Sequence, residues 1–380
     1  MAAWQRELLE LAFRSACKFP MEPHHKNRSR AQMVAVEACF QLGQPELALG
    51  FANDVRDWRR GGIYADYAFC VGKRGDADGA RRLIALAEGV AAGERASASS
   101  QEWRRDLIAI KVARAWSALG ERDKAAAAVA AVEETSLQAV DADVAATAAE
   151  RISLLPPEQA GAEFAAIDSA FLTQSLGQQG LSVELLVRLH ERFFADAVLR
   201  AAIERRFTEL FDKLMPNLRL GALARLARTN VHNGDLARGK ELVKSFRSIM
   251  EAHRWRTEDR LPQLAELIEL TFLVGDADRA RADAKAALAE WHTQREGVVD
   301  IFRAEALRPL ALAFYAIGDA PQGALVLELA IEEGQENPNS RPRCDDLVDT
   351  AVALCVRGIE PSAKAMQRLR EISGALGEPW

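Results

Sequence analysis

ALAFYAIGDAPQG, residues 311–323, places a glycine between two helical patterns, with one small residue seven positions before it and another five positions after it. Gly318 can adopt the left-handed backbone conformation that ends a helix. Asp319 can cap the next helix, because its carboxylate accepts hydrogen bonds from unpaired backbone N–H groups. Small side chains at Ala311 and Gly323 let two helices approach closely, so the stretch predicts a tight helical hairpin.

The same pattern recurs along the chain. The turn glycines are Gly43, Gly75, Gly120, Gly234, Gly275, Gly318 and Gly358. The residues seven positions before them are Val36, Ala68, Ala113, Ala227, Ile268, Ala311 and Ala351. The residues five positions after them are Ala48, Ala80, Ala125, Gly239, Ala280, Gly323 and Ala363.

Two weaker turns fit the long gap between Gly120 and Gly234. One lies at Leu155, with Ala148 seven positions before it and Ala160 five positions after it. The other lies near Asp196, with Leu189 and Ala201 at the same offsets. With these two turns, about nine antiparallel helix pairs cover the chain from about residue 29 onward.

The composition favours an all-α fold. Of the 380 residues, 49% are hydrophobic, 27% charged and 7% aromatic. Ala, Leu, Arg and Glu dominate, and all four form helices well. A chain of this length exceeds one ordinary core, so the recurring turns predict a repeat array, an α-solenoid.

The turns resemble those of the tetratricopeptide repeat family, which has a small residue on its first helix, a glycine in its turn and an alanine early on its second helix. The residues that carry the resemblance are Ala68, Gly75 and Ala80, then Ala113, Gly120 and Ala125, then Ala311, Gly318 and Gly323. The period departs from the standard 34 residues, as in the 40 residues from Gly318 to Gly358, which implies longer helices. Armadillo and HEAT repeats have a closer period but explain the Gly and Ala offsets less well. The resemblance covers most of the chain and implies a right-handed superhelix.

Residues 1–28 are expected to form an N-terminal capping helix and loop that stand apart from a continuous array at 29–380. Irregular composition predicts bends in this array near residues 91–100, 175–180 and 334–343. None of these stretches is long enough for a flexible interdomain linker.

The family resemblance also implies a partner-binding groove, lined by residues two, three and six positions before each turn glycine. The corresponding candidates here are Phe69, Lys73, Arg114, His190, Arg228, His232, Glu269, Phe272 and Tyr315. His190 joins them if a turn lies at Asp196. The family's clamp of Lys and Asn for a carboxylate is not reproduced, so recognition of a chaperone C-terminus is not expected.

The charge argues against binding to nucleic acids or to an anionic membrane, because the net charge is −6 and the pI is near 5.7. Residues 131–195 carry ten acidic residues against three arginines, whereas residues 200–257 carry thirteen basic against six acidic residues. Solvated helix faces would explain this pattern. Alternatively, the basic stretch steers an acidic peptide into the groove.

A cytoplasmic location is expected. The N-terminal stretch is charged and amphipathic, unlike a signal peptide, and no apolar run is long enough to span a membrane. Five widely spread cysteines suit a reducing compartment. The abundance of Arg and Ala favours a bacterial source.

Asp345-Asp346-Leu347-Val348-Asp349 matches the DDxxD pattern that binds magnesium and diphosphate in isoprenoid enzymes. The alternative, which we favour, is that these acids cap the last repeat's first helix and interact with its dipole. No HExxH, GxSxG, phosphate loop or Cys/His cluster occurs. We therefore expect no cofactor and no catalytic residues.

These patterns favour a non-catalytic scaffold or adaptor that binds a protein or peptide, possibly an acidic one. Two alternatives stay open: a helical-repeat enzyme or ligand-sensing module, and a fragment of a larger regulator. Substitution of Arg228 and His232 by glutamate would test the groove.

Overall fold

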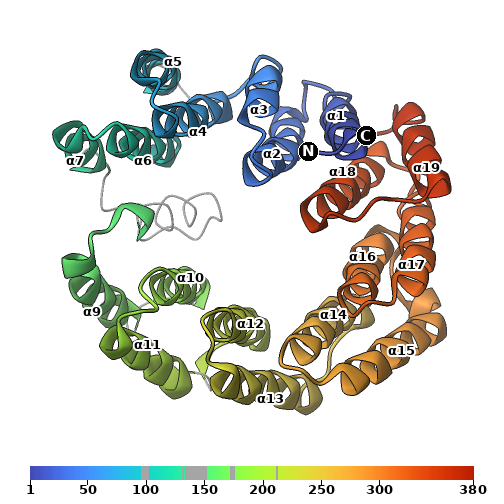
Figure 1. Cartoon of the computed structure of the whole chain (residues 1–380). Helices are drawn as coiled ribbons and strands as arrows, with labels where there is room; N and C mark the ends of the chain where they lie inside the picture. The colour runs from blue at the N-terminus through green and yellow to red at the C-terminus, as the bar shows by residue number, and fades with distance from the viewer. Residues whose placement is uncertain (96–101, 131, 133–151, 172–175, 211–212) are drawn as a thin grey trace. The chain divides into compact units, whose positions relative to one another are not determined.

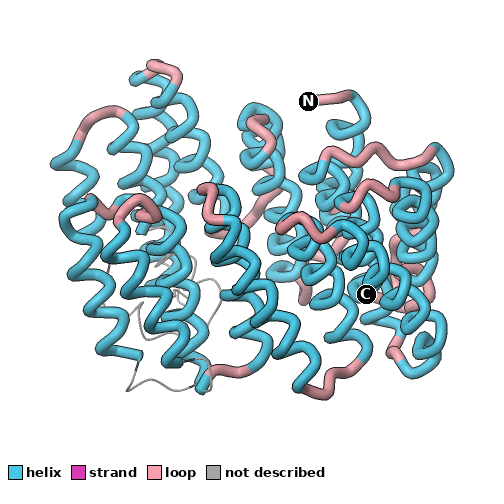
Figure 2. The backbone as a smooth tube through the Cα atoms, turned by 60° about the horizontal axis from the view of Figure 1, so that its bottom comes forward, coloured by secondary structure: helices cyan, strands magenta, loops and turns pink. Residues whose placement is uncertain are grey.

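The computed structural model describes residues 1–95, 102–130, 132, 152–171, 176–210 and 213–380. Within these residues the regular elements are helices joined by loops, without strands (Figure 2). This confirms the all-α class, with helices that pack against their neighbours. The chain divides into two compact units, one formed by Met1–Arg59 with Arg254–Trp380, the other by Arg60–His253.

The first unit contains both ends of the chain. Its helices are α1 (Ala3–Ala16), α2 (His25–Gln41), α3 (Pro45–Ala52), α14 (Thr257–Leu273), α15 (Ala277–Gln294), α16 (Asp300–Ala316), α17 (Ala320–Glu333), α18 (Ser340–Arg357) and α19 (Ala363–Gly374). Consecutive helices pair as hairpins, and α16 packs between α14 and α18 (Figure 1).

The second unit begins at the second residue of α4 (Arg59–Lys73). It continues with α5 (Ala77–Arg95), α6 (Glu102–Ala118), α7 (Arg122–Ala130), the 3-10 turn η2 (Pro157–Gln159), α9 (Ala160–Phe171), α10 (Leu176–Arg192), α11 (Ala197–Leu210), α12 (Pro216–His232) and α13 (Leu236–Ala252). Helix α12 packs against both α13 and α10.

The structure confirms the predicted glycine turns. All seven turn glycines have left-handed φ angles, from 67° at Gly43 and Gly358 to 93° at Gly275. Aspartates after the glycine cap the next helix, as predicted: Asp235 accepts from the backbone N of Arg238 at 3.0 Å. Such a cap satisfies one of the free N–H groups at a helix start.

Gly234→Ala should lower the free energy of unfolding by about 1 kcal/mol, because alanine at a φ of +88° is strained although its Cβ meets nothing within 4 Å. The matched control is Gly221→Ala in α12, where a Cβ also meets nothing. There alanine should be neutral or stabilise by about 0.5 kcal/mol through helix propensity. Thermal unfolding of both variants checks this, and equal shifts in Tm would contradict it.

The small residues around each turn are buried as predicted, with one exception. All seven residues at the position seven before the glycine have zero exposure. Of the seven residues that lie five positions after a turn glycine, six are buried. At one of them, Gly323, a Cβ atom would lie 2.7 Å from the Tyr315 ring. Ala363 is exposed, because the last turn is longer and α19 begins at Ala363 itself, after the Ser362 cap. Ala365 is buried in its place.

The two weaker turns are only partly as predicted. After Leu155 the chain forms η2 and then α9, with Ala160 buried, whereas Ala148 lies outside the described residues. Asp196 caps α11, since its Oδ1 accepts from the backbone N of Leu199 at 3.0 Å. Helix α10 ends at Arg192, four residues before the Asp196 cap, whereas α12 ends three residues before Asp235, so this turn is one residue longer. Leu189 is buried as predicted, but Ala201 is exposed.

The first helix does not stand apart. Helix α1 packs mainly against α18 and also against α2 and α19, so segments from the two ends of the chain share one core (Figure 1). The Gln5 side-chain amide donates to the carbonyl of Cys355 at 3.0 Å, and the hydroxyls of Ser15 and Ser373 lie 2.7 Å apart. Phe13 stacks on Phe51 with ring centroids 4.0 Å apart.

Two of the three expected bends are partly helical. Helix α10 already begins at Leu176, and α18 begins at Ser340, within the stretches predicted to be irregular. The third expected bend, near residues 91–100, lies partly outside the described residues, and α5 extends into it as far as Arg95.

Candidate functional site

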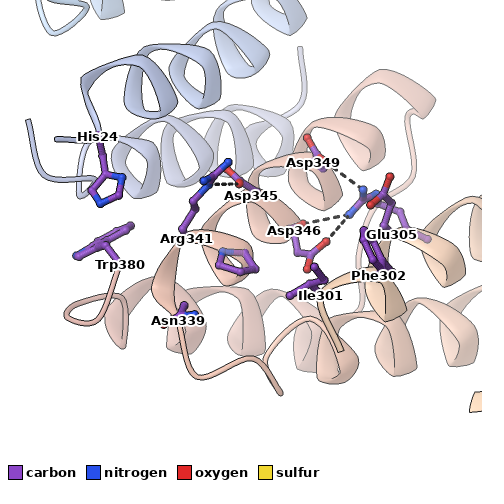
Figure 3. Close-up of a pocket in the computed structure, with 12 residues that line it drawn as sticks. His24, Ile301, Phe302, Glu305, Asn339, Arg341, Asp345, Asp346, Asp349 and Trp380 are labelled. Carbon is purple, nitrogen blue, oxygen red and sulfur yellow. Dashed lines mark hydrogen bonds and ion pairs between the residues drawn. The ribbon is translucent and has the colours of Figure 1, made fainter. Parts of the chain in front are cut away.

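A cavity of about 580 Å³ opens in the first unit beside α16 and α18 (Figure 3). Its volume lies within the range of small-molecule and side-chain sites. The residues that line it are His24, Ile301, Phe302, Glu305, Arg308, Asn339, Arg341, Pro342, Asp345, Asp346, Asp349 and Trp380. We call this cavity the α16–α18 pocket.

The acidic side of the pocket comes from the Asp345–Asp349 motif. Helix α18 begins at Ser340, and its first turn contains no acidic residue, so the interpretation of these acids as a helix cap was wrong. They lie further along the helix, where Asp345 and Asp349 are one turn apart and share a face. This spacing presents two carboxylates to the same space.

Arg308 supplies the opposing charge from α16. Only 9% of Arg308 is exposed. Its guanidinium donates to Asp346 Oδ1 at 3.4 Å, to Asp349 Oδ2 at 3.2 Å and to Thr350 Oγ1 at 3.4 Å. These contacts are long for charge-assisted hydrogen bonds. Arg308 therefore joins α16 to α18 without using all the acceptor capacity of the two carboxylates.

Asp345 is held more loosely. Its Oδ2 lies 3.8 Å from Arg341 Nε, beyond hydrogen-bond distance, and both side chains are about half exposed, at 48% and 52%. An exposed pair of this kind contributes little to stability. The Asp345 carboxylate therefore stays accessible from the pocket (Figure 3).

Burial raises the pKa of all three aspartates. The pKa of Asp346 rises to about 7, although the charge of Arg308 opposes the rise. The pKa of Asp345 rises to about 6, with Arg341 opposing, and that of Asp349 also rises. Because Asp346 is the least exposed of the three, at 14%, its shift has the clearest physical basis.

Asp346 should make the protein less stable as pH rises from 4 to 7. Its folded pKa of about 7 exceeds the ordinary value of 3.8. Its contribution is therefore fully present below pH 3.8 and is lost as pH rises through 7. Asp346→Asn should remove about 3 kcal/mol of this pH dependence of the unfolding free energy. Urea unfolding across this range checks it. The control Asp278→Asn changes a fully exposed side chain, so its unfolding free energy should depend on pH as in the wild type. The same pH dependence in Asp346→Asn would refute the raised pKa of Asp346.

Apolar side chains line the pocket at two ends, Ile301 and Phe302 near Glu305, and Trp380 beside His24 (Figure 3). Ile301 and Phe302 on α16 are exposed by 39% and 38%. Trp380 packs against Phe19 with ring centroids 4.7 Å apart, which holds the indole beside the pocket. Aromatic rings near carboxylates suit an organic cation, because the face of an aromatic ring carries a negative electrostatic potential.

The metal interpretation of the motif gains no support. Among the described residues, no group of three or more His, Cys, Asp and Glu side chains is placed to hold a metal ion. Arg308 already contacts two of the three carboxylates.

None of the groove candidates lines the pocket, but three of them meet in the second unit. The Arg114 guanidinium lies 4.6 Å from the centroid of the Phe69 ring, and Lys73 Nζ lies 5.1 Å from it. Arg114 also pairs with Asp66 at 2.6 Å, as does Lys111. The offset carried over from the repeat family thus identified neighbouring side chains on α4 and α6.

His190 is not a groove residue. It is 1% exposed, and its Nε2 lies 3.0 Å from Glu204 Oε1. Its expected position depended on a turn at Asp196. Helix α10 ends at Arg192, so His190 lies two residues before the helix end, whereas Arg228 lies four residues before the end of α12, and His190 is therefore on a different face. Glu204 also accepts from Arg238 Nε at 2.9 Å and Asn230 Nδ2 at 3.3 Å. Although burial opposes it, these hydrogen bonds lower the pKa of Glu204 to about 2.

Glu269 is also buried, with 7% exposure, and accepts two hydrogen bonds from Arg357 on α18, at 2.9 and 3.0 Å. It therefore connects α14 to α18 and is not available to a partner. The remaining candidates do not line the pocket: His232 is exposed, and Arg228, Phe272 and Tyr315 are half-buried.

The acidic and basic stretches partly neutralise each other inside the second unit. Arg225 pairs with Glu191 at 2.6 Å and also with Glu184, and Arg206 pairs with Asp168. These arginines belong to the basic stretch and the carboxylates to the acidic one. The basic stretch should therefore attract an acidic peptide less strongly than its number of basic residues indicates. Residues 133–151 of the acidic stretch lie outside the described residues.

The sequence analysis singled out the aspartates but missed Arg308, Phe302 and Trp380. One signal for Arg308 was present: it interrupts an apolar run between Leu307 and Leu310, so that a charge falls on a buried face. A buried arginine requires a carboxylate partner. The identity of that partner depends on how α16 and α18 pack.

Comparison with models of known protein families and with curated proteins finds no match to this chain. The fold and the pocket therefore carry the functional argument.

Proposed function

We propose that this chain is a non-catalytic scaffold or adaptor built as a tetratricopeptide-like α-solenoid, which binds a protein or peptide partner. The family assignment is supported by the seven left-handed glycine turns and by the zero exposure of every residue seven positions before them. Stacked repeats of this type create extended binding surfaces.

The observation that carries the binding proposal is the α16–α18 pocket. It combines a cavity of about 580 Å³ with exposed apolar side chains at Ile301 and Phe302. Interfaces gain most of their energy where an anchor side chain fills such a pocket. A partner side chain inserted between these apolar side chains and the aspartates would bury both.

Selection of random 12-residue peptides displayed on phage, against the immobilised full chain, tests this proposal. We expect a shared motif and micromolar Kd values for synthetic copies, typical of transient peptide recognition. Phe302→Asp should weaken binding at least about tenfold, because it removes an apolar contact from the pocket.

The matched control is Leu325→Asp on α17, which changes another exposed apolar residue, 62% exposed and outside the pocket. It should bind the selected peptides like the wild type. Failure to enrich any peptide would refute the proposal, and equal loss in both variants would refute the pocket assignment.

A ligand-sensing module is the second candidate. The observation that favours it is the pair of aspartates whose pKa values rise to about 6 and about 7 inside a cavity, since perturbed carboxyl groups gather at functional sites. Binding of a small cation with no detectable peptide binding would favour this candidate.

We also propose a cytoplasmic location. Cys39, Cys344 and Cys355 are buried free thiols whose pKa values burial raises, which is typical of unreactive cysteines in a reducing compartment. In the described part of the chain, no helix has the length and apolar character that crossing a membrane requires.

A further inference from the structure

The lining of the α16–α18 pocket carries an excess of negative charge. Four carboxylates, from Glu305, Asp345, Asp346 and Asp349, face only two guanidinium groups, from Arg308 and Arg341. In a partly desolvated cavity, such an imbalance attracts a cation more strongly than on an open surface. The group that fills the pocket should therefore be positively charged.

Two of these carboxylates are available to a ligand. The side chains of Asp345 and Asp349 are 48% and 47% exposed, and their contacts with arginines are 3.8 and 3.2 Å long. Each carboxylate has about four acceptor sites. Because the two residues are one helical turn apart, a planar donor group can reach both.

Two aromatic side chains are independent of the acids and restrict the cation further. Phe302 lines the pocket near Glu305, and Trp380 lines it beside His24 (Figure 3). A guanidinium group is planar and weakly hydrated, so it stacks on aromatic rings and donates in a fork to carboxylates, whereas an ammonium group is compact and strongly hydrated. The pocket already shows this chemistry, since the guanidinium of Arg308 bridges Asp346 and Asp349.

We propose that the α16–α18 pocket binds the guanidinium group of an arginine side chain in the partner peptide. This rests on the proposed function and names the class of side chain that the pocket recognises. The arginine inserts beside the Phe302 ring and donates to the carboxylates of Asp345 and Asp349, and the flanking peptide contacts Ile301 at the rim.

Binding should depend on pH. The titratable and charged groups that face the site are Glu305 and Arg308 from α16, Arg341, Asp345, Asp346 and Asp349 from α18, and His24 before α2. The aspartates must be ionised to hold a guanidinium, so protons compete with the ligand. Affinity should rise about tenfold between pH 5 and pH 8.

The test uses a matched pair of acetylated, amidated pentapeptides, Gly-Gly-Arg-Gly-Gly and the same peptide with citrulline, which keeps the shape of arginine without its charge. Isothermal titration of the full chain should give binding of the arginine peptide and at least about tenfold weaker binding of the citrulline peptide. Asp345→Asn with Asp349→Asn should abolish the difference, and the control Asp278→Asn, outside the pocket, should preserve it.

Equal affinity for the two peptides would overturn the proposal, as would binding of Mg²⁺ that displaces the arginine peptide. Tighter binding of agmatine than of the peptide would overturn the peptide source of the guanidinium. The proposed function fails separately: if phage selection yields neutral peptides that depend on Phe302, partner binding stands and the arginine assignment falls. If the arginine pentapeptide binds more tightly than the citrulline pentapeptide, but phage selection yields no 12-residue peptide, the scaffold proposal falls.

Discussion

Replacing both Leu8 and Leu9 with alanine should destabilise the two ends of the chain together, by about 4–8 kcal/mol. Both side chains have zero exposure, and helix α1 packs between segments that are far apart in the sequence, α2 on one side and α18 on the other. Each truncation loses the transfer free energy of the leucine and leaves a cavity, and neighbouring sites need not add.

Hydrogen exchange measured by mass spectrometry checks this prediction. Amides of α18 should lose protection together with those of α1, because the two helices share one core and exchange in cooperative units. The control Leu325→Ala changes a leucine that is 62% exposed, and should shift stability by less than about 0.5 kcal/mol. Loss of protection restricted to α1 and α2 would show that the first helix behaves as a simple cap.

This arrangement shows where sequence patterns stop being informative. The glycine turns were predictable because a left-handed residue and two small residues at fixed offsets are local requirements. The burial of Ala68 and Ala311 follows from the same local geometry. The position of α1 depends on contacts between residues as far as 350 positions apart, such as Gln5 with Cys355, and no periodicity encodes them.

The candidate site illustrates the same limit. The spacing of Asp345 and Asp349 indicated a shared helical face, and that part was right. The role of the motif depends on Arg308, which contacts Asp346 and Asp349 from the preceding hairpin. His190 and Glu269 failed as groove residues for related reasons. The early end of α10 places His190 on another helix face, and a distant arginine on α18 covers Glu269.

Two buried carboxylates in this protein show why residue type alone does not set a pKa. Burial acts on both Asp346 and Glu204 in the same direction. Glu204 receives three hydrogen bonds from neighbours at 2.9 to 3.3 Å, and its pKa falls to about 2. Asp346 receives only the distant guanidinium of Arg308, at 3.4 Å, and its pKa rises to about 7. The number and length of donated hydrogen bonds decide the sign.

Trp291→Ala should lower the free energy of unfolding by about 3–5 kcal/mol, because it removes the largest side chain that is fully buried among the described residues. Trp291 lies on α15, which packs against both α14 and α16. The cavity left by its indole would therefore weaken contacts between two successive hairpins.

Trp291→Phe is the matched variant. The indole Nε1 of Trp291 is buried without a hydrogen-bond partner, and an unsatisfied buried donor is unfavourable. Phenylalanine removes that donor and keeps most of the apolar volume, so it should cost less than about 1.5 kcal/mol. Urea unfolding followed by circular dichroism measures both variants. Because repeats interact mainly with their neighbours, hydrogen exchange in Trp291→Ala should increase in α14 to α17 and stay at the wild-type level in α12 and α13. Uniform loss of protection throughout the chain would contradict a repeat array with nearest-neighbour coupling.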